Sequence, residues 1–187
     1  MKILKRLFVN NIMEEIETLI AKFYLKEEEE VFIYTDELAK MGGAEVKGRM
    51  LKLLFEDNEE VQYLAAATLS KIKDNQDILP DFFAAINHPL LRNRNSSLVE
   101  ALSGFDVSDY FVDILKWYLI GGLKTSAMAK LLLDYTEFNI TPRILKKARK
   151  HLHHFEYNSP KDDRSELKHY ETMEILNDLE ALLGGTA

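Results

Sequence analysis

Apolar residues recur along most of this chain at intervals of three and four, the spacing that places side chains on one face of an α-helix. The first such stretch covers residues 2–24 and the last covers residues 163–183. No stretch alternates apolar and polar residues over the length of a strand. The pattern therefore predicts an all-α fold.

Glycine, proline and capping residues mark the helix boundaries between these two ends. Gly42 and Gly43 end one helix, because glycine is the usual residue just past a helix terminus. Asn58 is a typical N-cap, Asp106 or Ser108 is expected to cap a later helix, and Pro89 suits a first helical position. The expected helices are 27–40, 44–55, 59–72, 78–87, 89–103, one that follows Asp106 or Ser108 and ends at about 120, 123–135 and 142–155.

Three of the helix starts share one pattern. Val61, Leu91 and Leu123 lie 30 and 32 residues apart, and Val31 lies a further 30 upstream. Small or apolar residues follow four and eight positions after Val61 and Leu123, whereas Asn95 and Val99 stand at these positions after Leu91. The pattern places Leu69 and Leu131 in the predicted core. Helix pairs with a period of about 30–45 residues cannot bury their apolar faces alone and must stack on their neighbours.

These helix starts resemble the second helices of HEAT repeats, which usually read Asp-x-x-Val-Arg, then paired alanines, then leucine. The residues that carry the resemblance are Asn58 to Gln62 with Ala65, Ala66 and Leu69, and Pro89 to Arg92 with Val99. Gln62 and Lys124 stand where that pattern has arginine, and Asn95-Ser96 stands where it has alanines. The resemblance covers residues 44–135 and implies a right-handed α-α superhelix of about four HEAT-like hairpins.

A longer run, His88 to Leu102 followed by Phe105 to Phe111, is similar to small bacterial HEAT-repeat proteins. Some of these are encoded beside polymorphic or contact-dependent toxins and act as their immunity proteins. The resemblance implies a protein that binds and neutralises one cognate toxin. It implies a class of partner and no particular site residues, because fold-level likeness leaves the site open.

Composition narrows the picture further. The 187 residues, 47% of them hydrophobic, are expected to form a single domain over 1–187, and the absence of cysteine excludes disulfides and thiol chemistry. The longest strongly apolar segment, residues 117–123, is too short to span a bilayer, so a cytoplasmic protein is expected. The net charge is −7, and residues 1–60 carry 9 basic and 14 acidic side chains. An acidic half favours a basic partner over a nucleic-acid backbone.

Polar groups near the repeat-helix starts form the predicted partner-binding surface, which would attract a basic toxin domain such as a nuclease. Its members are Glu59, Glu60, Tyr63, Asn93, Arg94 and Asn95. Arg92 is expected instead to pair with an acid of the neighbouring repeat, Asp57, Glu59 or Glu60. Tyr63, Tyr110, Trp117 and Tyr118 are candidates for aromatic surface, although a packing role is the more common one for each.

Metal binding has little support in the sequence. His151, His153 and His154 share a predicted helix, but a site needs three or four ligands in a defined geometry, so a solvated helix end is the simpler interpretation. Glu166-x-x-His169 has di-iron spacing, yet such sites need two copies of the motif. We expect no metal and no cofactor.

Catalysis has no supporting motif, so we expect a protein that is not an enzyme, either a monomer or a homodimer. The basic run Arg143, Lys146, Lys147, Arg149 and Lys150 leaves open a DNA-binding, base-excision enzyme with HEAT-like repeats. Duplex binding normally requires a broad positive footprint, which one basic helix does not supply. The run also suits a role in balancing the acidic half. A generic interaction scaffold is the other alternative.

Overall fold

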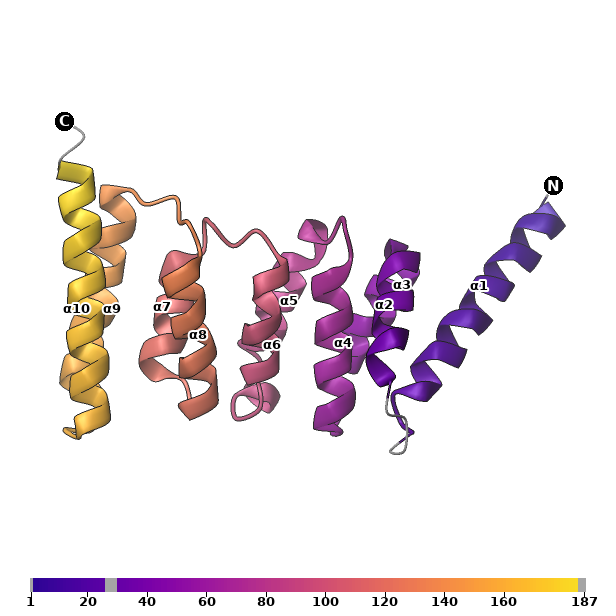
Figure 1. Cartoon of the computed structure of the whole chain (residues 1–187), viewed down its shortest axis with the longest axis horizontal. Helices are drawn as coiled ribbons and strands as arrows, with labels where there is room; N and C mark the ends of the chain where they lie inside the picture. The colour runs from indigo at the N-terminus through magenta and orange to yellow at the C-terminus, as the bar shows by residue number, and fades with distance from the viewer. Residues whose placement is uncertain (1, 26–29, 185–187) are drawn as a thin grey trace. The chain divides into compact units, whose positions relative to one another are not determined.

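The computed structural model is helical, with no strand among the residues that it describes (Figure 1). It describes the backbone of residues 2–25 and 30–184, and the side chains of residues 11–25 and 30–184. The apolar stripe expected at Ile3, Leu4, Leu7 and Phe8, and the helix start expected at Glu27, lie outside the described residues or side chains. The all-α prediction is confirmed, and the superhelix stays a prediction.

The chain divides into two compact units, residues 1–105 and 106–187. Helix α4 is central to unit 1, because it packs against α2, α3 and α6 and buries Val61, Leu64, Ala65 and Leu69. The helices of unit 1 are α1 Lys2–Lys22, α2 Val31–Met41, α3 Gly43–Leu53, α4 Glu59–Lys71, α5 Leu79–Ile86 and α6 Ser96–Ala101. Short 3-10 helices cover Gln76–Ile78, Pro89–Leu91 and Leu102–Gly104.

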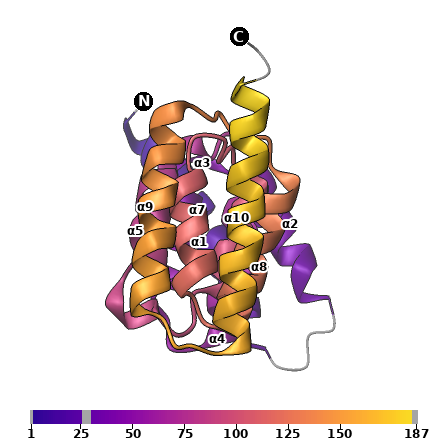
Figure 2. The ribbon, with the colours of Figure 1, turned by 90° about the vertical axis from the view of Figure 1, so that its left-hand side faces the viewer.

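Unit 2 contains two long helix pairs, and α7 packs against both α8 and α9. Its helices are α7 Phe111–Ile120, α8 Leu123–Tyr135, α9 Pro142–Asn158 and α10 Asp163–Gly184. Figures 1 and 2 both show α9 and α10 side by side, and a four-residue connection makes them antiparallel. Leu145, Leu152 and Phe155 of α9 are buried, so one face of this helix belongs to the core.

A buried polar side chain joins the two helices of three successive hairpins. Gln62 Nε2 donates to the Leu54 carbonyl over 2.7 Å, and Asn95 Nδ2 donates to the Ile86 carbonyl over 3.0 Å. Ser126 Oγ donates to the Tyr118 carbonyl over 2.8 Å. Each acceptor lies in the last residues of one helix or just after it, where carbonyls lack a partner in their own helix. We call these three contacts the hairpin bonds.

The hairpin bonds correct the repeat register expected from the sequence. Val61 and Leu91 are buried as expected, but Leu123 is 71% exposed and Leu131 is 49% exposed. The positions that correspond to one another in the three hairpins are the donors of the hairpin bonds, Gln62, Asn95 and Ser126. Each donor is followed by buried apolar residues three and seven positions later. Those residues are Ala65 and Leu69, Leu98 and Leu102, and Ala129 and Leu133. The prediction that Leu131 lies in the core is therefore wrong.

The helix expected over residues 89–103 is interrupted. A 3-10 turn at Pro89–Leu91 is followed by a turn in which the Arg94 N–H donates to the Leu91 carbonyl over 2.9 Å, and α6 begins only at Ser96. The amide of Asn95 is engaged in its hairpin bond, which holds the chain in this bent path. The expected cap of the next helix is also displaced, because α7 begins at Phe111.

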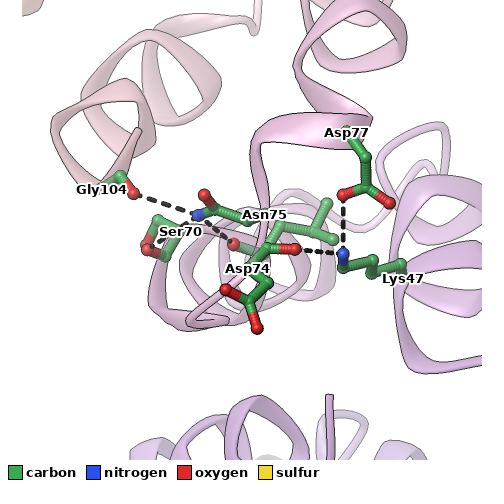
Figure 3. A network of polar contacts seen from close by, with 7 residues as sticks. Lys47, Ser70, Asp74, Asn75, Asp77 and Gly104 are labelled. Carbon is green, nitrogen blue, oxygen red and sulfur yellow. Dashed lines mark hydrogen bonds and ion pairs between the residues drawn. The ribbon is translucent and has the colours of Figure 1, made fainter. Parts of the chain in front are cut away.

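A polar network binds the end of α4 to the segment that follows α6 (Figure 3). Asn75 Nδ2 donates to the carbonyls of Leu69 and Gly104, each over 3.0 Å, and of Ser70 over 3.3 Å. Nearby, Lys47 Nζ donates to the Asp74 carbonyl and forms a 2.6 Å ion pair with Asp77. All of these contacts except the Asp77 ion pair give backbone carbonyls a buried or partly buried donor, so their role is to hold neighbouring helices of unit 1 together.

Truncation of leucines tests the corrected register. Leu69→Ala removes a side chain with 0% exposure and should lower the free energy of unfolding by about 2–5 kcal/mol. Leu131→Ala should cost less than about 1 kcal/mol, because half of that side chain is already in water. Leu132→Ala, at the adjacent buried position of α8, serves as the matched control and should again be costly. Urea denaturation measures all three, and equal losses at 131 and 132 would contradict this register.

Gly104 tests the close packing beside Asn75. A Cβ at this position would lie 2.2 Å from the Ser70 carbonyl oxygen, so Gly104→Ala should force a backbone shift and cost about 1–3 kcal/mol. Gly48 lies inside α3 with nothing within 4 Å of its added Cβ, so Gly48→Ala should stabilise by about 0.5–1 kcal/mol. Thermal unfolding of both variants measures the difference. A Gly104→Ala protein as stable as Gly48→Ala would refute the close approach.

Candidate functional site

The turn between α3 and α4 presents a cluster of carboxylates to solvent. Asn58 caps α4, because its side-chain oxygen accepts hydrogen bonds from the N–H groups of Glu60 and Val61 over 3.0 and 3.3 Å. Acidic residues are favoured at such a helix start by the partial positive charge of its N–H groups. The exposed acidic residues here are Glu56, Asp57, Glu59 and Glu60.

The connection between α5 and α6 lies beside this turn. Phe55, which is 43% exposed, packs its ring edge-on against His88 at a centroid distance of 5.2 Å. Arg94 forms a 3.2 Å ion pair with Asp57. Leu90, in the same connection, is 72% exposed. We call the four carboxylates, Phe55, Leu90 and Arg94 together the acidic edge.

The predicted surface residues meet different outcomes. Glu59, Glu60 and Asn93 are exposed, as expected. Tyr63 is half-buried and contacts Phe32 of α2 edge-on at 6.0 Å, so it lies toward α2. The binding roles of these residues stay predictions.

Two expectations about the 92–95 turn are wrong. Asn95 is only 6% exposed and donates a hairpin bond, so it does not line a surface. The ion pair with the neighbouring repeat, expected of Arg92, is made by Arg94, whereas Arg92 is exposed. The bend before α6 explains both results, because it turns residue 94 toward Asp57 and residue 95 inward.

The packing role weighed for the aromatic residues holds for two of them, because Trp117 and Tyr118 are buried in unit 2. The exposed apolar side chains of this edge, Phe55 and Leu90, were not among the expected surface residues. The only local signal was their position: Phe55 precedes an acidic turn and Leu90 follows a proline.

The basic run lies on α9, and its exposed members share one side of that helix. An open groove of about 570 Å³ lies between α9 and the last turns of α10. Its lining residues are Pro142, Leu145, Lys146, Arg149, Lys150, His153, Glu180 and Leu183. Arg149 is held by Glu180 through two contacts of 2.6 and 2.7 Å, and by Asn177 over 2.9 Å.

The histidines and carboxylates do not converge. Among the described residues, no group of three or more metal-ligating side chains is placed to hold an ion. Glu166 and His169 line a pocket of about 220 Å³ together with Lys161 and Ser165, at the turn between α9 and α10. Burial and the nearby Lys116 lower the pKa of His151. In addition, the described helices include none with the length and hydropathy needed to cross a membrane.

A buried lysine connects α10 to the α7–α8 pair. Lys168 Nζ donates to the Leu119 carbonyl over 2.9 Å and to Ser126 Oγ over 2.8 Å, and it lies 5.7 Å from the centre of the Tyr118 ring. Burial lowers the pKa of Lys168 to about 8. Burial and a hydrogen bond to Glu171 raise the pKa of Tyr118. The lysine extends the Ser126 hairpin bond and satisfies a carbonyl at the end of α7, which is a structural role.

Comparisons with protein families, with curated proteins and with solved structures find no match to this chain.

The pKa of Lys168 predicts how stability depends on pH. Between its folded value of about 8 and the unfolded value of about 10.4, the unfolded chain retains a proton that the folded chain has lost. The free energy of unfolding should therefore rise with pH, by up to about 2 kcal/mol between about pH 8 and 9.5. Above about pH 10 the raised pKa of Tyr118 acts in the opposite direction, because the unfolded tyrosine ionises first.

Urea denaturation at several pH values measures this slope. Lys168→Met should remove the rise, whereas Lys161→Met, at an exposed lysine of the same unit, should retain it. An identical slope in both variants would show that Lys168 is not the titrating group.

Proposed function

We propose that this chain is a protein-binding helical-repeat protein that uses the acidic edge to engage a basic partner. The observation that carries the proposal is the combination at that edge of four exposed carboxylates with the exposed apolar side chains of Phe55 and Leu90. Carboxylates steer a cationic partner and orient it, and apolar side chains supply the burial that lengthens the life of the complex.

The local structure favours binding without rearrangement. Asn58 caps α4 within the turn itself, and two contacts tie the turn to the neighbouring connection: Arg94 pairs with Asp57, and His88 packs against Phe55. A surface that is ordered before binding loses less conformational entropy when a partner docks. The unit that carries this edge is also acidic as a whole, with 13 basic and 18 acidic residues in 1–105.

The specific role that we propose is neutralisation of a cognate toxin. It rests on the resemblance of residues 88–102 and 105–111 to small bacterial HEAT-repeat proteins, some of which are immunity proteins. That stretch includes Leu90 and Arg94 of the acidic edge. Basic toxin domains, such as nucleases, bind nucleic-acid phosphates through cationic sites. An acidic partner that covers such a site blocks the substrate and is attracted by the same charges.

Two alternatives carry less support. A generic scaffold would use the same edge without inhibiting its partner. A base-excision enzyme with HEAT-like repeats would need a broad positive footprint, but residues 106–187 carry 11 basic and 13 acidic side chains despite the basic run on α9.

Charge reversal tests the steering role of the edge. Where a toxin-like gene lies beside the gene of this chain, Glu59→Lys with Glu60→Lys should slow association with its product by about tenfold or more at low salt, and should weaken the salt dependence. Glu14→Lys with Glu15→Lys makes the same charge change at exposed positions of α1 and should have a smaller effect. Stopped-flow mixing measures the rates, and equal effects of the two pairs would leave only net charge as the cause.

Truncation of the exposed Phe55 and the half-buried Tyr63 tests the apolar part. Phe55→Ala should weaken binding of the same product by more than about 1 kcal/mol if Phe55 is an anchor, and Tyr63→Ala is expected to do the same. Tyr135→Ala removes an exposed ring from α8 of unit 2 and should leave binding unchanged. Isothermal titration calorimetry measures the affinities. If both truncations weaken binding by less than about 0.5 kcal/mol, neither Phe55 nor Tyr63 is an anchor.

Co-expression separates the toxin-neutralising role from a scaffold. The chain should protect cells that express the neighbouring gene product, and the Glu59→Lys, Glu60→Lys variant should protect less. If that product is harmless, or if the chain fails to protect against it, the immunity proposal is wrong and only a protein-binding role remains.

A further inference from the structure

We propose that the groove between α9 and α10 binds a second ligand class, an acidic amphipathic segment of a protein. This inference does not depend on the proposed function, because it concerns a different surface, in unit 2, of opposite charge. The groove combines an apolar floor with a cationic rim, and each part selects for one property of the occupant.

The floor is apolar because of how α9 begins and α10 ends. Pro142 stands at the first helical position of α9, and Leu145 follows one turn later with its side chain almost entirely buried. Leu183 comes from the last turn of α10 and lines the same groove. With a volume of about 570 Å³, the groove has room for several side chains of a docked peptide.

The rim is cationic, and its two lysines are free to contact a ligand. Lys146, Lys150 and His153 are exposed and line the groove at successive turns of α9. Within the part of the chain that the structure describes, neither Lys146 nor Lys150 forms an ion pair. By contrast, Arg149 is committed to Glu180 and Asn177. That pair lowers the pKa of Glu180 and neutralises a carboxylate that lines the groove on the α10 side.

These features favour a peptide over a nucleic acid. A phosphate backbone is recognised by a broad field of positive charge, and its charged phosphates gain nothing from contact with an apolar floor. An amphipathic helix places its apolar side chains in a hydrophobic groove and its charges along the rim. Because the rim is basic, the charges of the fitting occupant are acidic.

The arrangement of α9 supplies a matched control. Arg143, Lys147 and His154 are exposed on the same helix but do not line the groove. Lys146→Glu with Lys150→Glu therefore alters the rim, and Arg143→Glu with Lys147→Glu makes the same charge change beside it. All four positions are exposed, so both variants should fold, and circular dichroism and thermal unfolding check this.

The probe is a fluorescein-labelled peptide of about 12 residues, which as a helix is about 18 Å long and matches the groove-lining part of α9. It carries leucines on one helical face and glutamates elsewhere. A second peptide of identical composition distributes the leucines around the helix. Fluorescence anisotropy at low and high salt measures the affinities of both peptides.

The amphipathic peptide should bind the unaltered chain at least about tenfold more tightly than the redistributed peptide does, because only it can fill the floor. The rim variant should lose at least about tenfold in affinity, and the control variant less than about threefold. Equal losses in the two variants, or equal binding of the two peptides, would overturn the proposal in favour of general electrostatic attraction.

Two other occupants are tested in the same experiment. A labelled single-stranded oligonucleotide that binds more tightly than the peptide, and is lost in the rim variant, would assign the groove to nucleic acid and overturn the proposal. Sedimentation velocity of the chain alone tests self-association. Dimers that the rim substitutions abolish and the control substitutions retain would assign the groove to a second copy.

Discussion

The hairpin bonds are the contacts on which the rest of the structure depends. A helix that ends inside a protein leaves carbonyls without partners, and burying them without compensation costs several kcal/mol. Gln62, Asn95 and Ser126 each bring a donor to such a carbonyl from the start of the next helix. They thereby set the rotation of α4, α6 and α8, and with it the faces that enter the core. The leucines at 69, 102 and 133 are buried as a consequence of that rotation.

The sequence predicted those features that local chemistry determines. Asn58 caps α4, glycines end α2, and α8 and α9 begin at Leu123 and Pro142 as expected, because caps and breakers act over a few residues. It could not predict the register of α8, since Leu123, Ala127 and Leu131 have the same helical spacing as the residues that are buried. A spacing rule identifies a face but not which of two faces meets a neighbour.

The candidate surfaces also combine features that local sequence determines with features that depend on residues distant in the chain. The exposure of Glu59 and Glu60 followed from their place at a helix start, whereas that of Phe55 and Leu90 depends on what the neighbouring turn covers. Asn95 was assigned to the surface because it is polar, and its buried role needs the carbonyl of Ile86, nine residues away. The basic run on α9 was visible in the sequence, but the groove beside it requires Leu183 and Glu180 from another helix.

The hairpin bonds constrain only one of the two residues that they join. Every acceptor is a main-chain carbonyl, which is present whatever side chain occupies positions 54, 86 and 118, and the donors are an amide of glutamine, a shorter amide and a hydroxyl. The interaction therefore requires only a side-chain hydrogen-bond donor within reach of the carbonyl, and not a particular amino acid. Such hairpins can retain their geometry through extensive substitution, so related chains would share this contact long after their residue identities had diverged.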